Sequence, residues 1–149
     1  MSPITIRQAV LADLETLVPL FDGYRQFYKQ ASDLAGAREF LRDRFEHGQS
    51  TLFLALDGEI AVGFTQLYPL FSSTRLKRFY LLNDLFVAES GRKKGVGTGL
   101  LDAAVNYARE LGACGLTLST ALTNVTAQRV YDAAGWKRDN QYLVYDFDL

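Results

Sequence analysis

Apolar residues in the first third of the chain recur first at the spacing of a strand and then at that of helices. An Ile-Thr-Ile centre predicts a short strand over Pro3 to Arg7. From Leu14 to Tyr28 the apolar positions follow a helical period after Asp13, a residue type that caps helices. Pro19 lies within this run, so the helix is expected to begin late, bend or break there. A second helix is expected after Ser32, ending near Gly48.

The period then changes to that of strands. A compact apolar run from Thr51 to Leu56 is followed by Asp57-Gly58, a dipeptide typical of two-residue hairpin turns. Ile60 to Leu70 continues as a second strand, and Leu76 to Val87 is the third strand of this group. The sheet is therefore expected to begin antiparallel.

The last third of the chain alternates helices with strands. In order, the pattern predicts a helix from Val96 to Leu111 with Gly112 as its stop, a strand from Leu116 to Thr120, a helix from Asn124 to Ala134 capped by Gly135, and a terminal strand from Tyr142 to Phe147. Residues 1–149 are thus expected to form a single domain of the α/β class, α+β in type, whose sheet ends in β-α-β units.

Composition limits the chemistry that this domain can perform. The chain has 149 residues, 48% of them apolar, which is enough for one well-packed core. A net charge of −1 gives no global field to attract nucleic acid or an anionic membrane. The single cysteine, Cys114, and the single histidine, His47, exclude a disulfide framework and the common cysteine or multi-histidine metal sites. With one thiol and no apolar run typical of a signal peptide or membrane span, a cytoplasmic location is expected.

The most informative stretch is the basic, glycine-bearing loop before the helix that begins at Val96. It reads Gly91-Arg92-Lys93-Lys94-Gly95-Val96-Gly97-Thr98-Gly99. The N-terminus of a helix presents unpaired N–H groups and a partial positive charge, and both attract phosphate. Gly95 and Gly97, with Gly99 as a further candidate, would allow the backbone to approach that anion because no Cβ intervenes.

Two common phosphate-binding motifs do not fit this loop. A Walker A motif counted from Gly91 requires glycine where the chain has Val96. A dinucleotide-binding motif counted from Gly95 requires glycine where the chain has Leu100. The pattern Arg/Gln-x-x-Gly-x-Gly/Ala does fit, from Arg92 to Gly97. A polar loop that merely precedes a helix is the alternative interpretation of this segment taken alone.

Together with two further segments, this loop resembles the GCN5-related N-acetyltransferase (GNAT) family. Asp84-Leu85-Phe86-Val87 resembles the family's fourth strand, and the segment from Asn124 to Trp136 is similar to its Asn-x-x-Ala-x-x-x-Tyr-x-x-x-Gly-Phe motif, with Trp136 in place of the usual Phe. The resemblance implies a mixed, mostly antiparallel twisted sheet flanked by about four helices, and acetyl-coenzyme A as the acetyl donor. It implies that the following residues bind this cofactor: Leu85, Phe86 and Val87 through their backbone, then Arg92, Lys93, Lys94, Gly95, Val96, Gly97, Thr98 and Asn124.

The resemblance also implies a reaction in which the amine attacks the thioester directly within a ternary complex. Tyr131 matches the tyrosine of the family motif and is the implied general acid, although a packed aromatic residue on that helical face would show the same pattern. Asp84 is the candidate general base. Glu89 or a water chain from Asp84 is an alternative, and so is a purely structural role for Asp84.

The acceptor is expected to be a primary amine, either on a small polyamine-like molecule or on a protein or peptide. The resemblance implies that aromatic-rich regions surround it, and these walls would suit an amine on an apolar or flat body, or serve packing alone: Tyr24, Phe27, Tyr28, Tyr68, Phe71 and Tyr80. Two other functions remain open, a non-catalytic acyl-coenzyme A binding or regulatory module and a nucleotide-binding protein. The strand expected from Tyr142 to Phe147 could pair or swap in a homodimer.

Overall fold

The computed structural model describes residues 3–149, which divide into two compact units. The first unit ends at Ser119, and the second covers Thr120–Leu149. The elements of the first unit are, in order, β1 (Ile4–Gln8), a 3-10 helix η1 (Leu11–Asp13), α1 (Leu14–Phe27), α2 (Leu34–Glu46), β2 (Thr51–Asp57), β3 (Ile60–Ser72), β4 (Lys77–Val87), a 3-10 helix η2 (Glu89–Gly91), α3 (Val96–Glu110) and β5 (Leu116–Thr117). The second unit contains α4 (Val125–Ala133).

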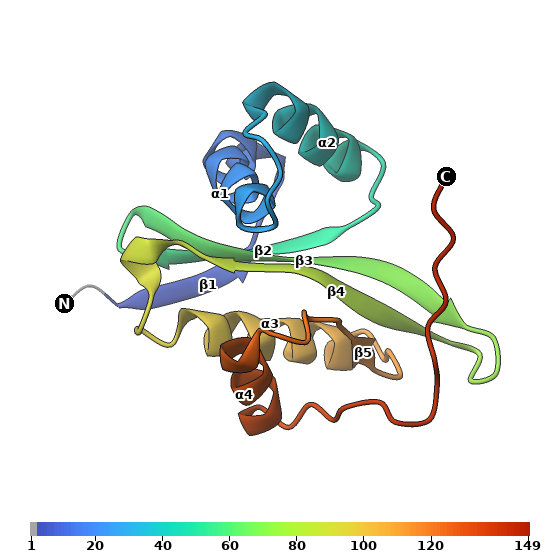
Figure 1. Cartoon of the computed structure of the whole chain (residues 1–149). Coiled ribbons are helices and arrows are strands. Elements are labelled where there is room, and N and C mark those ends of the chain that lie inside the picture. Colours follow the sequence, from blue (N-terminus) through green and yellow to red (C-terminus); the bar gives the residue numbers. More distant parts are fainter. Residues whose placement is uncertain (1–2) are drawn as a thin grey trace. The chain divides into compact units, whose positions relative to one another are not determined.

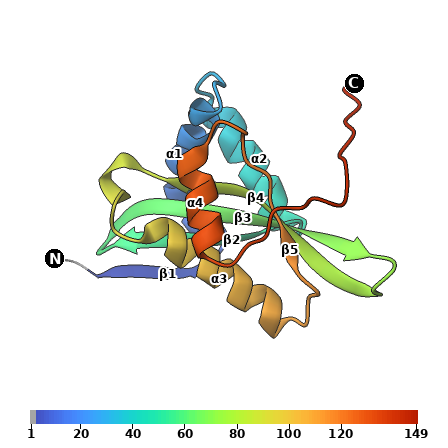
Figure 2. The same ribbon diagram turned by 60° about the horizontal axis from the view of Figure 1, so that its bottom comes forward.

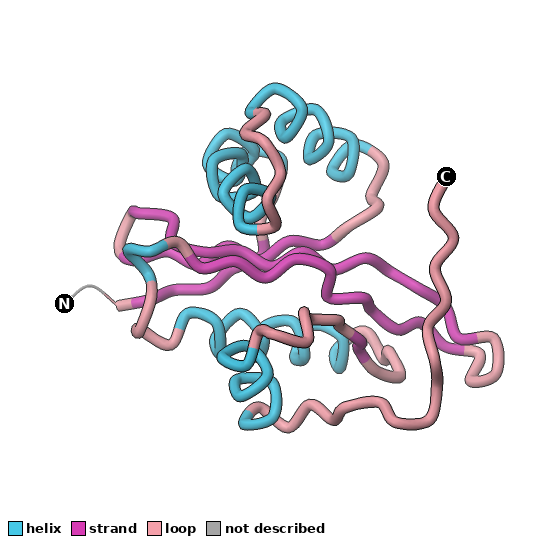
Figure 3. Tube along the Cα trace, viewed as in Figure 1, coloured by secondary structure: helices cyan, strands magenta, loops and turns pink. Residues whose placement is uncertain are grey.

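The strands of the first unit form one mixed sheet (Figure 3). Their order is β1-β2-β3-β4-β5. The pairs from β1 to β4 are antiparallel, and β4 and β5 are parallel. Together with α1 to α4, this confirms the predicted α+β class and the mixed, mostly antiparallel sheet.

Helices cover both faces of this sheet (Figure 1). α1 and α2 pack side by side on one face, and α3 lies on the opposite face, where it runs across the strands (Figure 2). Leu17 of α1, Leu41 of α2 and Phe64 of β3 are completely buried between the first two helices and the sheet. On the other face α3 buries one apolar stripe, composed of Val96, Leu100, Leu101, Ala104 and Ala108.

Pro19 neither delays nor breaks the first long helix. It lies inside α1, which is continuous from Leu14 to Phe27. A proline in a helix interior costs about 3 kcal/mol because it lacks the N–H donor. Burial of an apolar side chain contributes about 1.5–3 kcal/mol, and Leu17, Val18 and Leu20 around Pro19 are all buried. Packing of this stripe therefore outweighs the cost of the proline.

Two strand boundaries differ from the prediction. Asp57 pairs with Ile60, so the two-residue turn is Gly58-Glu59, one position later than expected. Gly58 has a φ of 62°, and a glycine adopts this left-handed conformation without strain. β5 covers Leu116–Thr117, and the predicted continuation of that strand to Thr120 is wrong because its ladder with β4 ends at Thr117.

The prediction of a terminal strand from Tyr142 to Phe147 is also wrong. The segment has no regular secondary structure, and Tyr142, Val144 and Phe147 are 77%, 83% and 89% exposed. A strand is stable only when a neighbour pairs with its backbone N–H and C=O groups. The second unit offers α4 as its regular element and no strand among its described residues. Among residues 3–149, none of the helices is both long enough and apolar enough to cross a bilayer.

Candidate active site

The N-terminus of α3 is open and carries uncompensated N–H groups. Gly95 occupies the N-cap position with a φ of 75° and has no side chain to cap the helix. The first intrahelical bond runs from Gly99 N–H to Gly95 O, 3.0 Å, so the N–H groups of Val96, Gly97 and Thr98 precede the helical ladder. The first turn contains no acidic residue. This arrangement can bind an anion through backbone N–H groups.

Gly97 and Gly99 differ in the space around their Cα atoms. A Cβ added to Gly97 would meet only Val87 Cγ2, at 3.9 Å, so packing within the described chain does not require glycine there. A Cβ on Gly99 would lie 2.5 Å from Ile6 Cδ1, so a side chain there would displace the end of the Ile6 side chain on β1. Gly99 thus packs against Ile6, whereas Gly97 leaves space that a ligand can fill.

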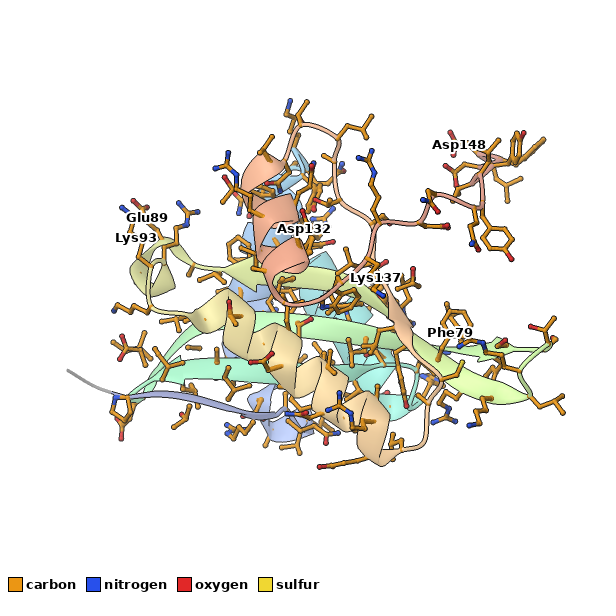
Figure 4. The ribbon with its side chains drawn as sticks, turned by 90° about the horizontal axis from the view of Figure 1, so that it is seen from below. Phe79, Glu89, Lys93, Asp132, Lys137 and Asp148 are labelled. Carbon is orange, nitrogen blue, oxygen red and sulfur yellow. The ribbon has the colours of Figure 1, made fainter. Side chains whose placement is uncertain are left out.

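The basic side chains of the loop are exposed, and one is partly neutralised. Lys94 Nζ forms an ion pair with Asp57 Oδ2 at 2.8 Å. Lys93 has a φ of 63°, and Figure 4 shows it beside Glu89 at the tip of the loop between β4 and α3. Arg92 is exposed on the same loop. Arg92 and Lys93 are therefore the cations of this loop most available to a ligand.

The second half of β4 presents one backbone edge away from β3. Ala88 N–H donates to Val62 O at 2.8 Å, so alternation along the strand directs the N–H and C=O groups of Val87 and Leu85 to the opposite edge. The pairing of β4 with β5 ends at Leu81. Within the described first unit, no strand pairs with that edge beyond Leu81, so an extended ligand can pair with it. The side chain of Phe86 packs against the core.

Asp84 is the buried carboxylate at the centre of this strand. Its side chain is almost completely buried. Gln66 Nε2 donates to its Oδ2 and Asn83 Nδ2 to its Oδ1, each at 2.6 Å. Burial raises the pKa of Asp84 to about 6, and the two amide hydrogen bonds oppose that rise. A carboxyl group with this pKa accepts a proton at neutral pH and releases it readily, as a general base must.

Gln66 is a member of the site that sequence reasoning missed. It is completely buried on β3 directly opposite Asp84, and its Oε1 has no hydrogen-bond partner among residues 3–149. A glutamine in the middle of an apolar strand was the available signal, because a buried amide needs polar partners. Thr65 Oγ1 donates to Asp84 O at 2.8 Å and fixes the same stretch of β4.

A cavity of about 330 Å³ lies above Asp84, between α1, α2 and the sheet. Its aromatic wall consists of Phe21, Tyr24, Phe40 and Tyr68. Burial, and then the negative charge of Asp84, raise the pKa of Tyr68, so its phenol stays neutral. Asn83 and Asp84 contribute the polar floor, and Arg25 and Asp33 are the other charged residues of the lining.

Only part of the predicted aromatic region lines this cavity. Tyr24 and Tyr68 do, and Tyr24 OH also donates to Asn83 O at 3.1 Å. Phe27 and Phe71 are instead 59% and 70% exposed, outside the lining. The remaining two predicted residues also lie outside it: Tyr28, which packs on Tyr24 and Phe27, and Tyr80, which is buried against Tyr107 of α3.

Glu89, the alternative base, lies in the exposed 3-10 helix η2 after β4. Its side chain is exposed, whereas that of Asp84 is buried. Among the described residues 3–149, no group of three or more acidic, histidine or cysteine side chains could hold a metal ion.

The second unit contains the two remaining predicted residues. Asn124 caps α4, since its Oδ1 accepts from Ala127 N–H at 3.1 Å, as expected for this residue type. Tyr131 lies on α4 and is half-buried, with its ring centroid 6.4 Å from that of Trp136. Gly135 ends the helix with a φ of 92°.

Comparison with known proteins defines the class of this α+β protein as an acyltransferase. The model of the Acetyltransferase (GNAT) family matches residues 17–136, and the chain belongs to this family. This confirms the family inferred from the loop and strand motifs, and it makes the protein an acetyltransferase.

Individual relatives agree with this assignment. The chain is 46% identical over 142 residues to the uncharacterized N-acetyltransferase YhfO of Bacillus subtilis (strain 168), covering 95% of each chain. A solved structure of a probable acetyltransferase has 41% identity and a TM-score of 0.93, with 97% of each chain covered. An aminoglycoside N-acetyltransferase in complex with CoA has a TM-score of 0.82 over 100% of this chain and 97% of that one, and its 20% identity supports a shared fold alone.

Proposed function

We propose that the protein is an acetyl-coenzyme A-dependent N-acetyltransferase that acts on a primary amine by direct attack in a ternary complex. The observation that carries the proposal is the alignment, along β4 and into α3, of a buried carboxylate, an available backbone edge and an open helix N-terminus. These three features match the three tasks of the reaction: to accept a proton, to orient a thioester and to hold phosphates.

The residues present fit coenzyme A. The N–H groups of Val96, Gly97 and Thr98, with Arg92 and Lys93, would hold its pyrophosphate, and Lys94 and Gly95 complete this loop. The backbone of Leu85 and Val87 would pair with the pantetheine amides, while Phe86 anchors the strand to the core. Asn124 is carried over from the family motif as a further cofactor residue. The bound group supplies an acetyl thioester.

Asp84 is the proposed general base. It would accept a proton, directly or through water, from the ammonium of the acceptor, and its raised pKa suits that transfer. Tyr131 is the proposed general acid for the departing thiolate, an assignment that rests on the family motif. Because the amine itself attacks the thioester carbonyl, so that the C–N bond forms and the C–S bond breaks, the enzyme needs no nucleophile of its own.

We further infer one acetyltransferase domain over residues 1–149, located in the cytoplasm and assembled as a homodimer. The lone thiol, Cys114, suits a reducing compartment. The exposed apolar segment from Tyr142 to Leu149 suggests a partner chain as its cover.

Two substitutions of equal size test the cofactor site. Gly97→Leu places a side chain where phosphate is expected, whereas Gly115→Leu adds the same side chain in open space. We expect Gly97→Leu to abolish the thermal stabilisation by coenzyme A, and Gly115→Leu to retain it. Equal stabilisation of both variants would refute the assignment.

The same assay separates the alternatives. Stabilisation by ATP but not by coenzyme A would identify a nucleotide-binding protein. Stabilisation by coenzyme A, without acetyl transfer to polyamines, amino acids, aminoglycosides or peptide amines, would identify a non-catalytic binding module.

A further inference from the structure

We infer that the acceptor is a compact primary amine with a single positive charge on an apolar body, and that Arg25 discriminates against acceptors with further positive charges. The inference rests on the proposed function, because it assigns the cavity above Asp84 to the acceptor.

The walls of the cavity favour an apolar ligand. The rings of Phe21 and Phe40 are stacked, with centroids 5.6 Å apart and planes 12° from parallel. The ring of Tyr24 lies nearly parallel to that of Phe21, at an angle of 16° and a distance of 6.3 Å. These rings pack on one another, and the guanidinium of Arg44 lies over Phe40, 4.4 Å from the ring centroid, so the cavity has an aromatic lining but no open parallel slot. An aromatic lining is complementary to an apolar group, and an ammonium beside it gains cation–π attraction.

The charges of the lining select one ammonium. Arg25 is positive, and Asp33 and Asp84 are negative, so the lining carries a net charge of −1 when all are ionised. Asp33 is already engaged, because its Oδ1 accepts from Gly36 N–H at 2.9 Å and caps α2. Asp84 also accepts hydrogen bonds, from Gln66 and Asn83, but it lies beside the available edge of β4, so the proposed function assigns it to the ammonium of the acceptor.

Two further charges flank the lining and offset each other: Asp22, which is attracted by Arg25, and Arg44, which lies over Phe40. A monocation therefore neutralises the cavity, whereas a dication leaves one positive charge in excess.

The position of Arg25 is fixed by the chain around it. Its Nη1 donates to Ala31 O at 3.1 Å, which ties α1 to the connection before α2. Asp22 fixes the same connection, since its carboxylate accepts from Ser32 Oγ at 2.7 Å and from Asp33 N–H at 2.8 Å. These contacts place the guanidinium beside the cavity.

The size of the cavity limits the ligand further. Its volume of about 330 Å³ is at the low end of the range of small-molecule pockets, roughly 300–1,000 Å³. An aminoglycoside, which is large, hydroxylated and polycationic, satisfies neither the volume nor the charge of this lining. A peptide would have to insert a single side chain.

Two amines with the same ring test this inference. Benzylamine carries one ammonium group, and para-xylylenediamine adds a second at the far end of the ring. We expect the full-length enzyme with acetyl-coenzyme A to show kcat/KM, measured by coenzyme A release, at least tenfold higher for benzylamine. Spermidine, kanamycin and a lysine-containing peptide should also fall below benzylamine.

Charge reversal at Arg25 is the second part of the experiment. Arg25→Glu should reduce the preference for benzylamine over the diamine at least tenfold or invert it. Arg42→Glu makes the same charge change on α2, outside the cavity lining, and should keep the preference of the wild type.

The possible outcomes separate the inference about the acceptor from the proposed acetyltransferase function. Acetylation of the diamine, spermidine, kanamycin or the peptide at least as efficiently as benzylamine would overturn the inference and leave the proposed function standing. An unchanged preference in Arg25→Glu would overturn the role of Arg25. If coenzyme A binds but no amine causes its release, the proposed function fails, and the inference fails with it.

Discussion

Replacement of the buried carboxylate of Asp84 by an amide should stabilise the protein while it impairs catalysis. Burial raises the pKa of Asp84 from an ordinary value of 3.8 to about 6. At about 1.4 kcal/mol per pH unit, this difference corresponds to a cost of about 3 kcal/mol for the ionised group in the folded state. Asp84→Asn removes the charge and therefore that cost.

The neighbouring side chains can accommodate the amide. Gln66 Nε2 now donates to Asp84, while Gln66 Oε1 is buried without a partner among the described residues. Rotation of the Gln66 amide by half a turn would let its Oε1 accept a hydrogen bond from the Nδ2 group of the introduced asparagine. The carbonyl oxygen of the new side chain would still accept from Asn83 Nδ2. The variant thus loses a charge without losing its hydrogen bonds.

The pH dependence follows from the direction of the pKa change. Because Asp84 binds its proton more tightly in the folded state, its contribution to stability is greatest below about pH 4 and falls as the pH rises through about 6. Asp84→Asn should therefore be more stable than wild type by about 2–3 kcal/mol near pH 7.5, with no advantage below pH 4. Equilibrium urea unfolding of both proteins across this range, followed by circular dichroism, measures the difference.

Asp22→Asn is the matched control with the opposite sign. Asp22 is also buried, but hydrogen bonds from the Asp33 backbone and from Ser32 lower its pKa. Its contribution to stability is present above the unfolded pKa and is lost as the pH falls, so Asp22→Asn should destabilise at neutral pH. If Asp84→Asn were destabilising by the same amount at acidic and neutral pH, Asp84 would be a structural hydrogen-bond acceptor, and the argument from burial would be refuted.

Three further results are expected. Tyr131→Phe should lower kcat at least tenfold while the affinity for coenzyme A, measured by calorimetry, is unchanged; equal turnover would remove Tyr131 as the general acid. Phe40→Leu should raise the KM for benzylamine about three- to tenfold, since a flat wall is lost, and Phe27→Leu, outside the cavity, should not; equal effects would refute the aromatic wall. Removal of residues 142–149 should convert a dimer to a monomer in sedimentation experiments, and an unchanged mass would show that this segment is not the dimer contact.

The sequence patterns predicted most helices and strands because burial of one face repeats at the period of the element. Apolar residues at a helical period mark α1 and α3, and Asp13, Gly95 and Gly112 lie at their ends. The terminal segment from Tyr142 has the composition of a strand, yet composition does not provide a partner for its backbone. Local preference therefore predicted helices, which satisfy their own hydrogen bonds, better than it predicted this strand.

The sequence predicted those residues of the site that lie in one continuous segment. The loop from Arg92 to Thr98 is one such segment, and its motif led directly to the helix N-terminus. Gln66 and Arg25 belong to elements that meet only after folding, so no local spacing relates them to Asp84. Gly97 and Gly99 look alike in the sequence, and only the approach of Ile6 to the second of them separates their roles.

The direction of Asp84 depends on an irregularity that the sequence pattern did not reveal. Gln66 pairs with Asp84 and Leu67 pairs with Leu82, so Asn83 is an extra residue in the ladder, a β-bulge. Side chains alternate along a strand, so residues four apart in a regular β4 would share a face. Tyr80 packs on Tyr107 of α3, yet Asp84 lines the cavity under α1 and α2 on the other face of the sheet.

The bulge therefore reverses which face of the sheet the side chains at the end of β4 point to. Phe86, two residues further on, lies against Gly23 of α1, as alternation from Asp84 requires. The displaced carbonyl of Asn83 accepts from Tyr24 OH at 3.1 Å, which compensates for its lost place in the ladder. A regular strand with the same sequence would bury Asp84 against α3, away from the aromatic wall. Because of this one inserted residue, Tyr80 before the bulge packs against α3, whereas Asp84 after the bulge faces the cavity under α1 and α2.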